Sequence, residues 1–271
     1  PSFSHHRHDC VKALFCLSNK KPVGEDGLFW IKLKVADNGD FNKISKAALD
    51  HRIAWVDDNL EDCLAVGRDY EASAHLWTNA DKPFQYIAAC RELYMVHCEG
   101  LGYESGLPIG LDGSNSGVQH YSGAALSHEG LYVNLKVTDE PQDLYAKVAD
   151  HVVKSIDKDD PSDPVVKAWQ DFGVGRKTVK RNVMTYPYSS NLYGFRDQIV
   201  EDFMRPINAQ VLRKQIQANP FETQRDEGFA AAGYLARKSW TAVNEIIADA
   251  AVGMDFFRKL SRLTSHEGKH M

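Results

Sequence analysis

The stretch Gly175–Arg196, which reads GRKTVKRNVMTYPYSSNLYGFR, is the part of the sequence that says most about the fold and its chemistry. Four of its residues are spaced four positions apart, namely Arg176, Lys180, Met184 and Tyr188. In a helix these positions form one stripe. The stripe offers two cations, a flexible apolar side chain and an aromatic ring, which suit a triphosphate and a stacked base. Arg181 adds a third cation beside it.

The end of this helix is also marked in the sequence. Pro187 lacks a backbone N–H, so it should bend or end the helix and leave Tyr188 at the terminus. The alternative interpretation is a solvated basic helix face with no ligand.

A second stretch, Leu107–Ser122, reads LPIGLDGSNSGVQHYS. Its apolar start is typical of a strand, and it delivers one carboxylate, Asp112, into a turn rich in Gly and Ser. A single Asp at such a place is often only a turn residue. Together with the cationic helix, however, it suggests a carboxylate that holds a metal beside cations that hold phosphates.

These two stretches resemble motifs of a known family. DGSNSGVQH (Asp112–His120) and RKTVKRNVMTYPYS (Arg176–Ser189) are similar to motifs A and B of the single-subunit RNA polymerases of bacteriophages and mitochondria. Shorter similar segments are NKKPVGEDG (Asn19–Gly27), VNL…QDLY (Val133–Tyr145) and YGFR (Tyr193–Arg196). The resemblance covers most of the chain and is closest to the phage members.

The resemblance implies a mixed α/β fold that is mostly helical. A polymerase palm, with a small antiparallel sheet carrying Asp112, is expected over residues 1–138, with a helical insertion at about 22–103. An incomplete helical fingers subdomain is expected over residues 139–271. The implied function is that of part of a DNA-directed RNA polymerase, which adds ribonucleotides to an RNA 3′ end on a DNA template by two-metal nucleotidyl transfer.

The resemblance also implies a catalytic set. Asp112, with the backbone carbonyl of Gly113, would bind Mg²⁺, which prefers carboxylate oxygen. Lys180 would neutralise the incoming triphosphate and protonate the departing pyrophosphate. The other nucleotide contacts implied for the motif B helix are Arg176, Arg181, Met184 and Tyr188, with Tyr188 sensing the sugar. Arg176 and Arg181 would add phosphate contacts, because each guanidinium can bind two oxygens.

Further positions correspond to the surroundings of the active site. Tyr145 would contact the nucleotide and His120 lie near it, although each could equally be a buried structural residue. Tyr193 and Ser189 would lie at the template DNA. The expected partners are therefore template, RNA product and ribonucleoside triphosphates.

Gly117 distinguishes two related activities. Family A DNA polymerases resemble the same Arg–Lys–Tyr spacing but place a Glu five residues after the motif A Asp, where it crowds a 2′-hydroxyl. Here that position is Gly117, which favours RNA synthesis. A family A DNA polymerase fragment remains an alternative.

Two departures from the family limit the expected activity. Ser189 stands where the family usually has Gly after the motif B Tyr. The second catalytic carboxylate, carried by a His-Asp-Ser-Phe-Gly motif, has no counterpart in this sequence. The isolated chain is therefore expected to be inactive, with the missing polymerase domains supplied elsewhere, for example on another chain. The second alternative is a non-catalytic nucleic-acid or nucleotide-binding module.

Composition is compatible with this interpretation. The 271 residues are 43% hydrophobic and 25% charged, typical of a globular protein. The formal net charge is −5, yet residues 173–215 carry eight Lys and Arg against three acids. No membrane-spanning apolar run or signal peptide is evident. All five cysteines precede residue 99, and their odd number favours reduced thiols in a cytoplasm, that of the host for a phage protein.

Helices are predicted over several further ranges. Amphipathic patterns indicate helices at Ile44–Val66 and Phe84–Cys98, and a helix that starts near Asp139–Pro141. Later helices are expected at Glu201–Ala218 and Gly233–Leu263, the second with an interruption at Gly253. The aromatic residues of that last helix are expected to lie in the core.

Overall fold

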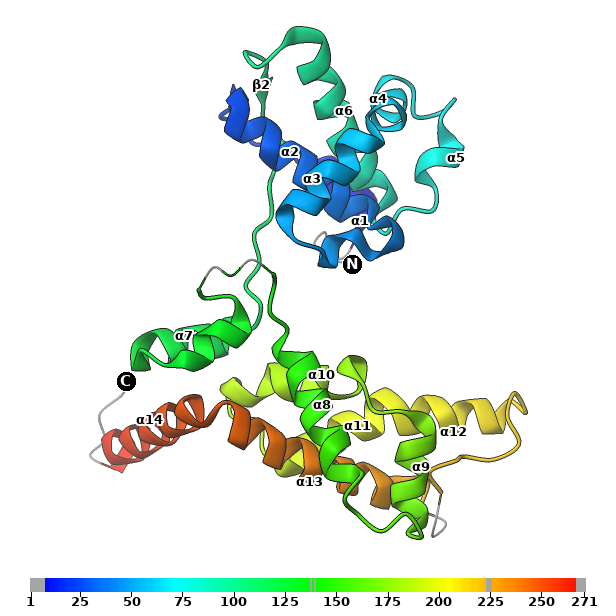
Figure 1. Cartoon of the computed structure of the whole chain (residues 1–271), viewed down its shortest axis with the longest axis vertical. Helices are drawn as coiled ribbons and strands as arrows, with labels where there is room; N and C mark the ends of the chain where they lie inside the picture. The colour runs from blue at the N-terminus through cyan, green and yellow to red at the C-terminus, as the bar shows by residue number, and fades with distance from the viewer. Residues whose placement is uncertain (1–7, 137, 139, 223–225, 267–271) are drawn as a thin grey trace. The chain divides into compact units, whose positions relative to one another are not determined.

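Helices make up most of the chain, which is arranged in two compact units (Figure 1). The computed structural model describes residues 8–136, 138, 140–222 and 226–266, without the side chain of His266. The N-terminal unit comprises Pro1–Asp112 and Asp139–Pro141, and the C-terminal unit comprises Gly113–Thr138 and Gln142–Met271. No described helix is long and apolar enough to cross a membrane.

The N-terminal unit is a helical cluster with one small sheet. Its helices are α1 (Asp9–Ala13), α2 (Gly24–Gly39), η2 (Phe41–Lys46), α3 (Leu49–Asp58), α4 (Leu60–Arg68), α5 (Ala74–Trp77) and α6 (Pro83–Glu99). Strands β1 (Lys21–Pro22) and β2 (Glu104–Ser105) pair antiparallel, with Lys21 opposite Ser105. The helices predicted at Ile44–Val66 and Phe84–Cys98 are confirmed in outline, the first one as two helices that meet at Asn59.

Close packing of α4 on α6 organises this unit. A Cβ atom on Gly67 would overlap the backbone carbonyl of Cys90, so only glycine permits the approach. Val35, Val56 and Leu93 lie in the apolar core around this contact.

The C-terminal unit contains the remaining helices. These are α7 (Ser116–Ala125), η3 (His128–Val133), α8 (Leu144–Ile156), α9 (Pro164–Phe172), α10 (Arg176–Thr185), η4 (Tyr186–Tyr188), α11 (Leu192–Ile199), the π-helix η5 (Val200–Met204), α12 (Arg205–Leu212), α13 (Phe229–Ile246) and α14 (Ala248–His266). Trp169, Phe195, Phe221 and Leu235 are fully buried in its core.

The segment that leads to Asp112 differs from its prediction. Asp112 is not carried by the sheet, because residues 106–113 form neither strand nor helix. Alternate residues Leu107, Ile109 and Leu111 instead line an open apolar hollow of about 400 Å³ beside β1 and β2. The prediction that this segment is a strand is therefore wrong, because a strand needs a hydrogen-bonded neighbour and none lies beside this segment in the described chain.

Several predicted helix boundaries are wrong. Helix α8 starts at Leu144 because Asp143 caps it, accepting the N–H groups of Tyr145 and Ala146 at 2.9 and 3.2 Å. The helix predicted at Glu201–Ala218 is instead η5 followed by α12, which ends at Leu212. Helix α9, which follows the Asp163–Pro164 start signal, was not predicted.

The last predicted helix is two helices that meet at Ile247 rather than at Gly253. Gly253 lies inside α14, where a Cβ atom would approach Tyr121 Cδ1 to 2.8 Å. Phe256 and Phe257 are exposed, so the prediction that they belong to the core is also wrong.

Candidate functional site

Helix α10 presents the predicted stripe to solvent. Its exposed side chains include Arg176, Lys180 and Met184, and Tyr188 follows in η4. The opposite face is buried in the core, through Thr178, Val179, Asn182 and Val183. The four-residue period therefore separates an exposed face from a packed one, as expected for an amphipathic helix.

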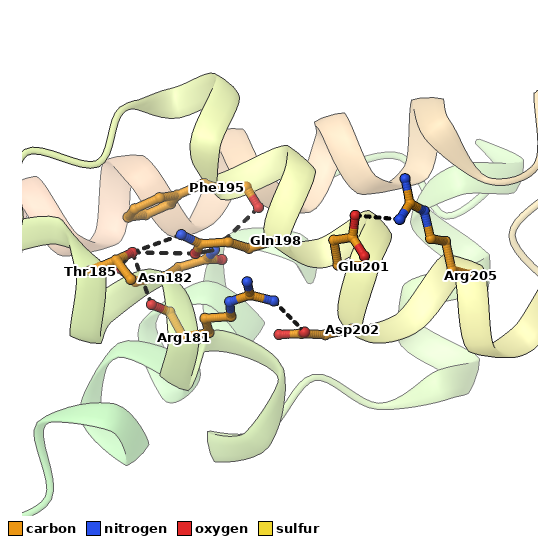
Figure 2. Close-up of polar contacts among 8 residues, drawn as sticks. All are labelled: Arg181, Asn182, Thr185, Phe195, Gln198, Glu201, Asp202 and Arg205. Carbon is orange, nitrogen blue, oxygen red and sulfur yellow. Dashed lines mark hydrogen bonds and ion pairs between the residues drawn. The ribbon is translucent and has the colours of Figure 1, made fainter. Parts of the chain in front are cut away.

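A buried amide network fixes α10 against α11 (Figure 2). Asn182 Nδ2 donates to Gln198 Oε1 at 2.8 Å and to the Phe195 carbonyl at 3.2 Å. Gln198 Nε2 in turn donates to the Thr185 hydroxyl at 2.9 Å. These bonds hold the rotation of α10, and so the direction of its exposed stripe.

Arg176 is held at the start of α8. Its Nε donates to Asp143 Oδ2 at 2.5 Å, while the other oxygen of Asp143 caps α8. The guanidinium carbon also lies 5.0 Å from the centre of the Tyr145 ring, and Lys180 Nζ lies 5.9 Å from it. Tyr145 is buried, so the two cations share an aromatic neighbour that is fixed by the core.

Lys180 and Arg181 differ in how their charges are compensated. Arg181 Nη1 pairs with Asp202 Oδ1 at 2.5 Å, and Arg205 Nη1 pairs with Glu201 Oε1 at 2.6 Å (Figure 2). Lys180 has no ion-pair partner among the residues described. Of these two cations it is therefore the one whose charge is open to a ligand.

The end of the helix rests on α7. The Tyr188 hydroxyl lies 3.0 Å from Ser116 Oγ, and the Tyr188 side chain is 66% exposed. A Cβ atom on Gly117 would come within 2.6 Å of Pro187 Cγ and 3.3 Å of Tyr188 Cζ. The space beside Gly117, where a 2′-hydroxyl is expected to fit, is thus occupied by Pro187 and Tyr188.

Asn115 links α7 to α10 through its side-chain amide. Its Nδ2 donates to the Val183 carbonyl at 3.2 Å, and its Oδ1 accepts the Val118 N–H, so it caps α7 and ties it to α10. Asn115, Ser116 and Asp143 were not predicted as site residues. Asp143 could have been found, since an Asp directly before an amphipathic run is a helix-start signal. Asn115 and Ser116 contact residues about 70 positions away in the sequence, so no pattern near them in the sequence predicts these contacts.

Ser189 ends the helical region in a left-handed conformation. Its φ is 70° and ψ is 22°, and its N–H donates to the Tyr186 carbonyl at 3.0 Å. A position of this kind favours glycine, which is the residue that the resemblance leads one to expect there.

Glu129 of η3 contacts the start of α14. Its two carboxylate oxygens accept the N–H groups of Asp249 at 2.7 Å and Ala250 at 3.1 Å, so it caps α14. Burial raises the pKa of Glu129 against the opposing effect of these bonds. Nearby, burial raises the pKa of Tyr186, whose hydroxyl donates to Asn244 Oδ1 at 2.6 Å.

Asp112 and Gly113 lie at the junction of the two units. Asp112 is exposed and closes the first part of the N-terminal unit, whereas Gly113 begins the C-terminal one. Gly113 leaves room for Gln119, whose Oε1 would be 2.5 Å from an added Cβ atom. The structure thus brings the α10 residues together with Tyr145, Ser116 and Ser189 within the C-terminal unit, whereas Asp112 belongs to the N-terminal unit.

The remaining predicted residues, His120 and Tyr193, are both exposed, His120 on α7 and Tyr193 on α11. In the described part of the chain, no three His, Cys, Asp or Glu side chains come together to hold a metal ion. Among the described residues, Asp112 therefore belongs to no such group.

Comparison with known proteins gives consistent matches. The family model described as DNA-dependent RNA polymerase matches residues 21–270. The DNA-directed RNA polymerase of Enterobacteria phage T3 is 31% identical over 99% of this chain, and T7 RNA polymerase of Escherichia phage T7 is 30% identical over 98%. The mitochondrial DNA-directed RNA polymerase of Mus musculus is 29% identical over 99%. The chain spans 32% of the two phage relatives and 21% of the mouse one.

Proposed function

Because this chain belongs to the DNA-dependent RNA polymerase family, we propose that its parent enzyme adds ribonucleotides to an RNA 3′ end on a DNA template. The observation that carries the proposal is the exposed stripe of α10, with Lys180 lacking an ion-pair partner among the described residues. A cationic stripe that ends in an exposed tyrosine fits a triphosphate followed by a sugar and base.

The triphosphate is proposed to bind along Arg176 and Lys180. Each charge-assisted hydrogen bond to a phosphate oxygen contributes roughly 1.5–3 kcal/mol. Lys180 is also the proposed proton donor to the departing pyrophosphate, being an exposed ammonium on the same stripe. Arg181 contributes only where a phosphate displaces Asp202, and Met184 offers apolar contact to the base.

Tyr188 is proposed to sense the sugar. Its hydroxyl has a partner in Ser116, and the missing side chain at Gly117 lets its ring lie over α7. A glutamate at residue 117 would not fit with Tyr188 in this position. The absence of that glutamate is what supports ribonucleotides over the DNA polymerase alternative, because the packing itself leaves no free space at Gly117.

Mg²⁺ is the proposed cofactor, with Asp112 and the carbonyl of Gly113 as its protein contacts. Bound there, it would stabilise the charge that develops on the transferred phosphate. Mg²⁺ usually takes one or two carboxylates and completes its shell with water and phosphate oxygens, so one Asp fits part of the site. We propose that a second carboxylate comes from the remaining part of the polymerase, on this polypeptide or another.

The wider assignments are proposals of the same kind. Residues 1–138 are assigned to the palm and 139–271 to the fingers, although the compact units divide at Asp112. Tyr193 and Ser189 are assigned to the template DNA. A phage polymerase of this family would act in the host cytoplasm, and the five free thiols of the chain are compatible with a reducing compartment.

Nucleotide binding to the 271-residue chain tests the proposal. We expect Lys180→Ala to weaken the binding of a fluorescent ribonucleoside triphosphate by roughly 10- to 150-fold, the equivalent of one charge-assisted bond. Lys154→Ala removes an exposed lysine near the other end of α8 and should leave the affinity unchanged. Equal weakening in both variants would mean that charge alone attracts the nucleotide, and the proposed site would be wrong.

A non-catalytic binding module is the second candidate, favoured by the presence of only one candidate metal carboxylate. Primer extension separates the two. The chain alone should give no product with Mg²⁺ and ribonucleotides. Once complemented by the remaining domains, a polymerase should lose activity on Asp112→Ala. Activity in the complemented Asp112→Ala protein would contradict the catalytic role of Asp112.

A further inference from the structure

Three lysines of the N-terminal unit come from separate elements that pack together. Lys12 lies on α1 and Lys34 on α2, and Lys82 directly precedes α6. Helix α6 contacts both α1 and α2 (Figure 1). In the described part of the chain, neither Lys12 nor Lys34 has an ion-pair partner, and Lys82 has the carboxylate of Asp81 at 3.9 Å.

Hydrogen bonds fix the positions of these elements. The carboxylate of Asp9 accepts the Phe84 N–H at 2.7 Å and Gln85 Nε2 at 2.9 Å, so α1 is bound to the start of α6. The Lys82 N–H donates to the Asn38 carbonyl at 2.9 Å, near the end of α2. Asn38 Nδ2 in turn donates to the Gln85 carbonyl at 3.1 Å. The start of α6 is therefore attached to both other helices.

Helical spacing brings the other two lysines toward Lys82. Lys12 follows Asp9 by three positions, and Lys34 precedes Asn38 by four, so each lysine shares a helix face with a residue that contacts the start of α6. Burial lowers the pKa of Lys34, and the positive charges of Lys82 and Lys12 lower it further. The half-buried ammonium of Lys34 is thus close to two like charges.

The carboxylate that favours the charged form of Lys34 is that of Asp37, and it is already bound to an arginine. Arg52 Nη1 lies 3.1 Å from Asp37 Oδ1, and Arg52 Nε donates to the Ala47 carbonyl at 2.9 Å. Burial raises the pKa of Asp37 against the opposing effect of Arg52. An anion bound at Lys34 would therefore supply the counter-ion that this lysine does not share with Arg52.

We propose that Lys12, Lys34 and Lys82 form a binding site for a compact phosphate anion, pyrophosphate. Three ammonium groups from separate elements suit an anion whose several charges lie on neighbouring oxygens, and each group has three N–H donors. A nucleic-acid backbone carries one charge per phosphate and is bound by cations that follow a groove. The site uses no residue of α10, so it goes beyond the proposed function and does not depend on it.

Labelling of lysines with acetic anhydride tests the site in the wild-type chain. The reagent attacks neutral amines, and mass spectrometry reads the labelling rate of each lysine. We expect pyrophosphate, added without metal, to slow the labelling of Lys34 about tenfold, the equivalent of a one-unit rise of its pKa. Lys32, on the same helix but paired with Asp57 at 2.5 Å, is the control and should be labelled at an unchanged rate.

Calorimetry of variants measures the affinity. Both variants are made in the Lys180→Ala protein, so that α10 contributes as little as possible. Lys34→Gln should weaken pyrophosphate binding by roughly 10- to 150-fold, whereas Lys32→Gln should leave it unchanged. Circular dichroism should show the same helix content in both.

Two results would overturn the proposal. If pyrophosphate slows the labelling of Lys34 no more than that of Lys32, the site is wrong. If a single-stranded oligonucleotide at the same phosphate concentration protects Lys34 better than pyrophosphate does, the ligand is a nucleic-acid backbone instead. Neither result bears on nucleotide binding by α10, which the comparison of Lys180→Ala with Lys154→Ala tests separately.

Discussion

Ser189 shows how one residue can carry a local conflict between sequence and backbone. The helical region must end beside Tyr188, and the chain turns there through the left-handed conformation at φ 70°. A side chain in this conformation places its Cβ near the following carbonyl, which costs roughly 1–2 kcal/mol. The substitution was evident from the sequence, but the backbone angle that makes it costly was not.

We expect Ser189→Gly to stabilise the protein. Glycine avoids the strain but loses more entropy on folding, so the net gain should be about 1 kcal/mol, or about 2–4 °C in Tm. The measurement is thermal unfolding followed by circular dichroism. Ser190→Gly is the control: Ser190 lies outside the left-handed region, so there glycine should stabilise nothing. A Ser189→Gly protein no more stable than wild type would contradict the strain argument.

At the scale of elements, the contact between α7 and the end of α10 depends on Gly117. An alanine there would place its Cβ 2.6 Å from Pro187 Cγ, and the ring of that proline cannot move without moving the helix end. We expect Gly117→Ala to cost about 1–3 kcal/mol of unfolding free energy, as for other overpacked sites.

Gly123 provides the comparison on the same helix. The nearest atom to an added Cβ there is Leu135 Cδ2 at 3.7 Å, an ordinary contact, so Gly123→Ala should be neutral or stabilising by up to about 1 kcal/mol. Chemical denaturation of both variants decides the matter. Equal effects would show that glycine flexibility, and not the close approach of α7, controls this region.

The cap of α14 by Glu129 predicts a pH dependence. Burial raises the folded-state pKa of Glu129, so the folded protein holds this proton more tightly than the unfolded chain does. The resulting stability is fully present below the unfolded pKa of about 4.3 and is lost as pH rises through the raised folded value. We expect Glu129→Gln, which does not titrate, to remove this part of the decline. Unfolding free energies of both proteins from pH 4 to pH 7 test it: parallel curves would refute the assignment.

The elements that could be predicted from the sequence are those whose structure depends on residues within one segment. The α10 stripe and the buried face of α8 depend on a 3.6-residue period within one segment, and the structure has both. The predicted start of α8 near Pro141 is wrong, because the side chain of Asp143 caps the helix two residues later. Residues 107–111 would be a strand only if another segment paired with them, and the pattern within the segment itself does not show whether such a neighbour exists.

At the scale of the whole molecule, the two apolar cores have no residue in common among those that the structure describes. Leu93 is buried in the N-terminal core and Leu235 in the C-terminal one. Each Leu→Ala substitution should cost about 2–5 kcal/mol in its own unit. Calorimetry should resolve two transitions, with Leu93→Ala lowering only one and Leu235→Ala only the other. A single transition that both variants shift equally would mean that the units unfold together.

Under the proposed function, the ion pair of Arg176 with Asp143 has a consequence for phosphate binding. Without nucleotide, this cation already has a resident counter-ion, so the surface carries less unbalanced charge than its composition suggests. A phosphate bound by Arg176 would then displace the Asp143 carboxylate, so that the arginine would exchange one anion for another. The released carboxylate keeps its other oxygen on the start of α8. In this proposal, phosphate binding to the stripe would reach α8 as a change in the hydrogen-bonding partner of Asp143, with no change of net charge at the arginine.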